Sequence, residues 1–200
     1  MKNQEDVQFM DKVIEALRKT AVELEEFRVQ AALGKAEAQD KYEEVKKNFN
    51  LFIHDNEHKV KGIKVKIEEL NTKFDELRVQ LALGKAETKE IFRKQKKDLL
   101  KTLHEIEVKI KTNETLNRMY ALTLIEIEIF KVQLEILEQK YIKGKKEAKA
   151  SFEKGKLEFN SFIDRLRTKY GKQKEVTKLE HFQNEISEAF HHFKNAFAKP

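Results

Sequence analysis

Two pairs of residues have the spacing that carboxylate–histidine metal sites use on helices. Glu188 and His191 lie three positions apart, as do Asp55 and His58. A ferritin-like di-metal centre needs two Glu-x-x-His pairs and further inward-facing glutamates. The chain has one such pair, and Asp55 and His58 fall in a predicted turn. We therefore expect no metal site.

The remaining reactive side chains do not form a catalytic constellation. There is no cysteine, and the serines stand only at 151, 161 and 187, with no histidine and aspartate arranged around them. The dipeptides at 34–35, 84–85 and 144–145 are Gly-Lys, but all three lack the second glycine and the following Ser/Thr of a phosphate-binding loop. We expect no catalytic residue, no cofactor and a non-enzymatic protein.

Composition points to helices as the elements that position these side chains. Charged residues make up 38% of the 200 residues, and turn formers are scarce, with six glycines and one proline. Sheet-containing folds need many more turn residues, so an all-β or Rossmann-like fold is excluded. The chain has no uncharged stretch of eighteen residues and no apolar run near its start, which favours a cytoplasmic location.

A twelve-residue segment occurs twice. Residues 26–37 and 76–87 match at ten of twelve positions, with Glu-x-Arg-Val-Gln-x-Ala-Leu-Gly-Lys-Ala-Glu in common. A degenerate third copy begins at 131–134 and resumes at 144–148, with seven extra residues between its halves. Seven residues are about two helical turns, so the insertion preserves the apolar face of a helix. We interpret the chain as one domain, 1–200, with internal repeats near 24–53, 74–103 and 128–163.

Apolar residues recur at a spacing of three and four along most of the chain, as in coiled coils. This pattern predicts an all-α, elongated antiparallel coiled-coil bundle of three long helices and one shorter C-terminal helix, about 4–55, 60–111, 114–169 and 174–197. Chain reversals near 59 and 114 would bring the repeat glycines to one level of the bundle. We expect a close approach of helices there, with a mild helix bend as the alternative, at Gly34, Gly84 and Gly144.

The third predicted helix carries two apolar stripes on opposite sides. One stripe can face the first two helices, whereas the other needs a further partner. We interpret the second stripe as the seam of a homodimer, formed by Leu122, Ile125, Ile129, Val132 and Ile136. Cover by the fourth helix within one chain, or contact with a lipid surface, are the alternatives.

The net charge of +6 is unevenly distributed. Acidic residues outnumber basic ones in 1–58, and the reverse holds in 59–112, so the charges of neighbouring helices can neutralise one another. The richest basic stretch is one helix face with Lys140, Lys143, Lys145, Lys146, Lys149, Lys154 and Lys156. An alternative function is therefore binding of an anionic surface, either membrane lipid or nucleic acid.

The repeated Arg-Val-Gln-x-Ala-Leu-Gly-Lys-Ala-Glu motif and the amphipathic stretch that follows it resemble uncharacterised bacterial coiled-coil proteins. The resemblance covers about 24–105 and, less closely, 128–163. It implies a helical fold and no particular activity. Together with the two stripes, it favours a structural or interaction protein that self-associates or binds an unknown protein partner.

Overall fold

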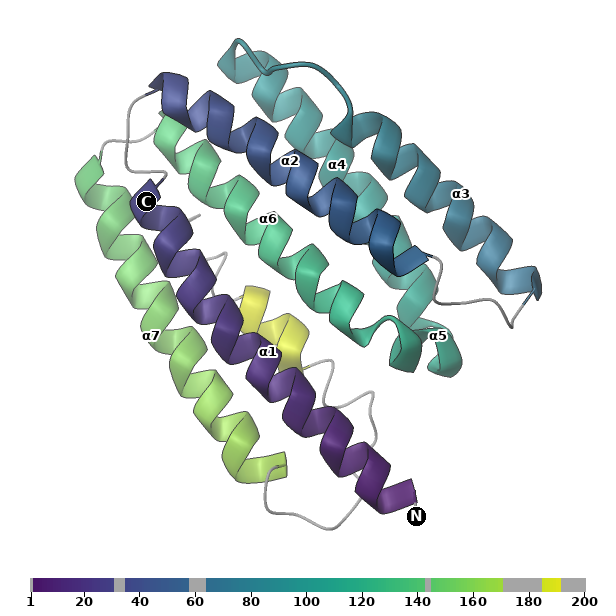
Figure 1. Cartoon of the computed structure of the whole chain (residues 1–200). Coiled ribbons are helices and arrows are strands. Elements are labelled where there is room, and N and C mark those ends of the chain that lie inside the picture. Colours follow the sequence, from purple (N-terminus) through teal and green to yellow (C-terminus); the bar gives the residue numbers. More distant parts are fainter. Residues whose placement is uncertain (1, 31–34, 58–63, 143–144, 171–184, 192–200) are drawn as a thin grey trace.

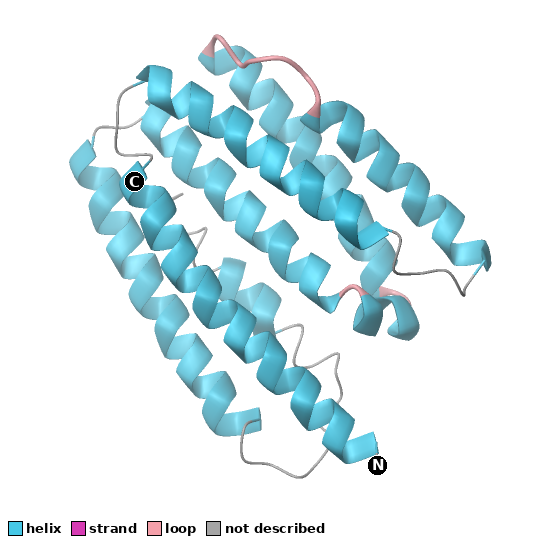
Figure 2. Ribbon diagram, viewed as in Figure 1, coloured by secondary structure: helices cyan, strands magenta, loops and turns pink. Residues whose placement is uncertain are grey.

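The computed structural model describes residues 2–30, 35–57, 64–142, 145–170 and 185–191. The predicted all-α class is confirmed, since these ranges contain helices and the turns that join them, and no strand (Figure 2). The helices are α1 Lys2–Gln30, α2 Lys35–Glu57, α3 Lys64–Leu81, α4 Lys89–Lys111, α5 Glu114–Met119, α6 Ala121–Ile142 and α7 Lys145–Tyr170. Residues 185–191 form a further short helix.

The prediction of three uninterrupted long helices is wrong. Each of the three divides at a copy of the repeated motif, giving α1 and α2, α3 and α4, and α6 and α7. The break between α3 and α4 is a loop in which Thr88 begins α4, its hydroxyl accepting a hydrogen bond from the Ile91 amide at 3.2 Å. Glycine disfavours helix, and Thr88, which directly follows the second motif copy, caps α4, so α3 ends and α4 begins at this copy.

The helices form a bundle in which α6 is central. Helices α1, α2, α4, α5 and α7 all pack against α6, α3 pairs with α4, and α1 pairs with α7 (Figure 1). Successive helices α3 and α4 run antiparallel, as do α6 and α7. The first and last of the long helices therefore lie side by side.

The central position of α6 explains its two apolar stripes. Ile127 and Ile129 point to nearly opposite sides of the helix, and both are buried. Within the predicted seam, Ile125, Ile129, Val132 and Ile136 are buried inside the chain, whereas Leu122 is 51% exposed. Our interpretation of this seam as an open dimer surface is therefore corrected, because helices of the same chain cover it. Self-association itself stays a prediction.

The glycine prediction is wrong at the one position the structure describes. Gly84 lies in the exposed loop between α3 and α4, not inside a helix, and a Cβ built there would meet nothing within 4 Å. Neither a close helix approach nor a helix bend therefore explains this glycine. Gly34 and Gly144 lie outside the described residues.

Helix α2 fixes the loop at 82–88 through side chains. The Gln39 amide donates to the carbonyl oxygens of Ala86 and Glu87, at 3.2 and 3.1 Å. The buried Lys46 ammonium donates to the Leu83 carbonyl oxygen at 2.6 Å. The second motif copy thus packs against the helix that follows the first copy. The ends of α1 and α6 and the beginnings of α2, α4 and α7 all lie at one end of the molecule (Figure 1).

Candidate binding groove

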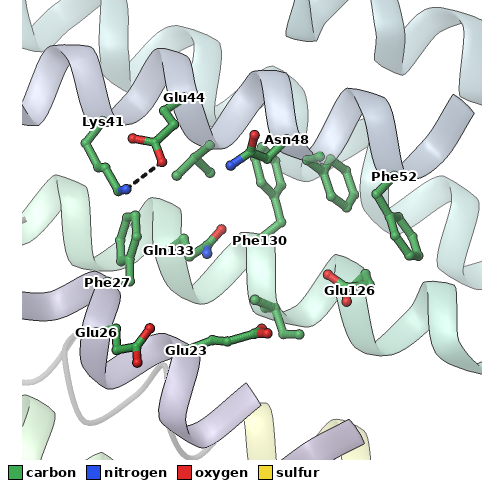
Figure 3. A pocket seen from close by; sticks show the side chains of 13 residues that line it. Glu23, Glu26, Phe27, Lys41, Glu44, Asn48, Phe52, Glu126, Phe130 and Gln133 are labelled. Carbon is green, nitrogen blue, oxygen red and sulfur yellow. Dashed lines mark hydrogen bonds and ion pairs between the residues drawn. The ribbon is translucent and has the colours of Figure 1, made fainter. Parts of the chain in front are cut away.

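A pocket of about 300 Å³ lies over α6, between α1 and α2. Helices α1 and α2 both pack on α6 and leave this space between them (Figure 3). On α6 the lining residues recur at three and four positions, so they form one face of that helix. We call this pocket the α1–α2 groove; it is lined by Glu23, Glu26, Phe27, Lys41, Glu44, Val45, Asn48, Phe49, Phe52, Glu126, Ile129, Phe130 and Gln133.

Aromatic rings make up much of the apolar lining. The Phe49 ring stacks on the Phe130 ring with centroids 4.2 Å apart and planes 6° apart, and the Phe52 ring lies 6.4 Å from that of Phe49. At the other end of the groove, the Lys41 ammonium lies 5.6 Å from the centroid of the Phe27 ring. This Lys41 nitrogen also donates to the Glu44 carboxylate at 2.7 Å. The groove thus already holds one cation between an aromatic face and a carboxylate.

The polar lining is acidic. Four glutamates and one lysine face the groove. Lys41 pairs with Glu44, and Lys19 pairs with Glu23 at 3.5 Å, outside the lining. Glu126 is half-buried and makes no ion pair or hydrogen bond with any described residue. Burial, and to a lesser extent the nearby Glu23 carboxylate, raises the pKa of Glu126 to about 7, against a small opposing effect of Lys19.

The opposite side of α6 has buried charges that are matched within the chain. The Lys131 ammonium contacts the Glu107 carboxylate of α4 at 2.5 Å and the Glu128 carboxylate at 3.4 Å. Lys96 of α4 contacts Glu135 at 2.6 Å and also Glu138. Burial raises the pKa of Glu107, with Lys131 acting in the opposite direction. These contacts join α4 to α6, and none of their residues lines the α1–α2 groove.

The structure describes the side chains of two members of the predicted lysine face, Lys154 and Lys156. Lys156 pairs with Glu25 of α1 at 2.5 Å, and the hydrogen bond from Lys156 lowers the pKa of Glu25. Lys154 is exposed. The side chains of the other members lie outside the described residues: Lys140, Lys143, Lys145, Lys146 and Lys149.

The candidate metal pairs do not come together in the described ranges. Asp55, Glu188 and His191 are exposed, and His58 lies outside those ranges. Among the described residues, no group of three or more potential ligands is placed to hold a metal ion. No helix of the described part is long and apolar enough to cross a membrane.

Sequence reasoning missed the groove, although one signal pointed to it. Glu126 and Glu128 alternate with isoleucines in the most apolar helix of the chain. A carboxylate in a helix that is apolar on both sides must be paired or must face a solvent-filled space. Glu128 is paired with Lys131, whereas Glu126 faces the groove.

Comparison of the chain with protein-family models, with curated proteins and with solved structures gave no match. The functional proposal therefore rests on the geometry of the groove.

Proposed function

We propose that this protein is a non-enzymatic binding protein whose ligand occupies the α1–α2 groove. The observation that supports the proposal is a solvent-connected pocket on the central helix, with stacked aromatic rings on one side and carboxylates around it. Ligand sites of proteins combine an apolar lining with a few polar groups in this manner. The groove residues come from three helices, so the folded bundle holds them in place.

The half-buried carboxylate of Glu126 strengthens the proposal. A carboxyl group with no ion-pair partner in the described residues costs folding free energy when it ionises. An apolar side chain or a lysine would suit the packing of α6 better at this position. Groups that disfavour the folded state and face a pocket are typical of binding and catalytic sites.

A fragment screen by ligand-observed NMR tests the proposal without assuming the chemistry of the ligand. We expect hits that bind the wild type and are lost in Asn48→Trp, because Asn48 is exposed and lines the groove, so an indole there would fill it. Lys47→Trp is the matched control, since Lys47 is exposed on the same helix and does not line the groove. Hits that survive Asn48→Trp, or no hits at all, would contradict the proposal.

Two alternatives from the sequence stay predictions. Self-association is tested by light scattering, and anionic-surface binding by salt-dependent retention on phosphatidylserine vesicles or on nucleic acid. In the described residues Lys156 is engaged by Glu25, which leaves fewer cations of that helix face for an anionic surface.

A further inference from the structure

We infer that the ligand of the α1–α2 groove is a small organic cation: an ammonium group on an apolar body. This inference rests on the proposed function and names the chemical class that the groove selects.

The charges of the groove favour a cation. The lining carries four carboxyl groups against one ammonium group, and that ammonium group, on Lys41, is already held by Glu44. Glu126 lies toward the opposite end of the groove from Lys41, near Phe52 (Figure 3). An anionic ligand would meet Glu23, Glu44 and Glu126 at close range, whereas a cation would relieve the repulsion between Glu23 and Glu126.

The groove also contains an internal example of the proposed recognition. Lys41 places its ammonium group over the face of Phe27 and against the carboxylate of Glu44. The far end offers the same two kinds of group, an aromatic ring in Phe52 and a carboxylate in Glu126, without a lysine among its lining residues. A ligand ammonium at this end would make contacts of the same type.

The size and shape of the groove define the rest of the ligand. A volume of about 300 Å³ lies at the lower end of the range for small-molecule sites. The stacked Phe49 and Phe130 rings supply an apolar wall for an alkyl or aryl body. A bare metal ion is disfavoured, because no three carboxylates of the described residues converge on one point.

Calorimetry with three matched probes tests the inference. The probes are 4-phenylbutylammonium, 4-phenylbutanol and 4-phenylbutanoate, which share the apolar body and differ in the charge of the head group. We expect the ammonium compound to bind about tenfold more tightly than the alcohol, which corresponds to about 1.4 kcal/mol, and the carboxylate compound not to bind. Asn48→Trp should abolish binding of all probes.

Glu126→Gln separates charge recognition from simple apolar binding. This change keeps the volume of the side chain and should lower the affinity for the ammonium probe about tenfold while leaving the affinity for the alcohol unchanged. Glu37→Gln is the matched control, because Glu37 is exposed on α2 and lies outside the groove lining. Circular dichroism at the same pH confirms that each variant is folded.

The pH dependence provides a second readout. Binding of a cation should displace the proton of Glu126, so the affinity for the ammonium probe should rise about tenfold between pH 6 and pH 8 and lose this rise in Glu126→Gln. The other charged groups that face this region are Lys19, Glu23 and Glu26 of α1 and Lys41 and Glu44 of α2.

The outcomes separate the two proposals. Equal binding of the alcohol and the ammonium compound, with no effect of Glu126→Gln, would overturn the cation inference and leave the groove as a binding site. Failure of all three probes would overturn the cation inference as well. The proposed function falls only if the fragment screen also finds no ligand that Asn48→Trp excludes.

Discussion

The two sides of α6 differ in whether their carboxylates have ion-pair partners among the described residues. On the side that faces α4, Glu128 lies in a buried network with Lys131 and Glu107, and Lys96 contacts two further glutamates. On the side that faces the α1–α2 groove, Glu126 is half-buried and its pKa is raised to about 7. The two glutamates Glu126 and Glu128 are only two positions apart, so the difference comes from the neighbouring helices and not from α6.

This contrast separates a structural role from a binding role. In the α4 interface, Lys131 and Lys96 each contact two glutamate carboxylates, and such pairs fix how two helices align. On the groove side, the Glu126 carboxylate makes no ion pair with a described residue. A cationic ligand would supply the compensation that α4 supplies on the other side.

The largest effect is expected in the α4 interface. Lys131→Met leaves the carboxylates of Glu107 and Glu128 buried without their ammonium partner, and should lower the free energy of unfolding by about 3–5 kcal/mol. Guanidinium denaturation at pH 7 measures the change. Lys154→Met, at an exposed lysine of α7, is the control and should stay within about 0.5 kcal/mol of the wild type. A loss below 1 kcal/mol in Lys131→Met would mean that the network does not support the helix contact.

Glu126→Gln should raise the free energy of unfolding, whereas Lys131→Met should lower it. The pKa of Glu126 is raised in the folded state, so the folded protein binds more protons than the unfolded chain between pH 4.5 and about 7. Stability from this group is therefore fully present below pH 4.5 and is lost as the pH rises through about 7. The variant should be more stable than the wild type by about 2 kcal/mol at pH 8, after solvent screening is allowed for, and equal to it at pH 4.

Urea denaturation at both pH values measures this difference. A Glu126→Gln variant that is less stable than the wild type at pH 8 would show that the carboxylate is satisfied within the chain, and the contrast between the two sides of α6 would disappear.

A smaller effect is expected at Lys41. Lys41→Gln removes the lysine that faces the groove, together with a partly exposed contact to Glu44, and should change stability by less than about 1 kcal/mol. The groove becomes more negative, so affinity for 4-phenylbutylammonium should rise about two- to threefold at low salt, a change that 1 M salt removes. Unchanged affinity at low salt would indicate that the groove charge does not contribute to binding.

The smallest effect is expected at Gly84, away from both sides of α6. Its φ is not positive, and a methyl group there would meet no neighbour within 4 Å. Gly84→Ala should leave stability unchanged or raise it by about 0.5 kcal/mol through the lower entropy of the unfolded chain. Thermal unfolding detects the change, and a lower melting temperature would mean that the loop requires a glycine-specific backbone.

Sequence patterns predicted the helical class and one chain reversal. The scarcity of glycine and proline favours helix, and a chain reversal was expected near 114. In the structure α4 ends at Lys111 and the Asn113 side chain accepts from the Leu116 amide of α5 at 3.1 Å. Polar caps between two periodic runs are a local signal, so they can be found in the sequence.

The helix breaks were missed because the apolar spacing of three and four continues through the motif. Leu81 and Ala86 are both buried although one ends α3 and the other lies in the loop. Periodicity cannot distinguish a buried loop residue from a helical one. At the break between α3 and α4, Thr88 was the overlooked signal, since it stands four residues after Gly84 and can cap a new helix.

The same error led to the interpretation of the second apolar stripe of α6 as a dimer surface. Three long helices and one short helix offer too few surfaces to cover α6, so a second chain was invoked for Ile125 and Ile129. In the structure α1, α2, α4, α5 and α7 pack against α6, and both residues are buried within the chain. The alternation of Glu126 and Glu128 with isoleucines was a signal for a carboxylate on each side of α6, but the groove could not be located from it, because its position depends on how far apart α1 and α2 lie on α6.

The pairing of α1 with α7 has a consequence for how the protein is made. Helix α1 leaves the ribosome before α2 to α6, yet its neighbour α7 is synthesised after all of them. Until α7 emerges, part of the apolar surface of α1 stays uncovered on the nascent chain. A pause in translation before α7 should therefore lengthen the time in which chaperones or other chains can capture the N-terminal helix.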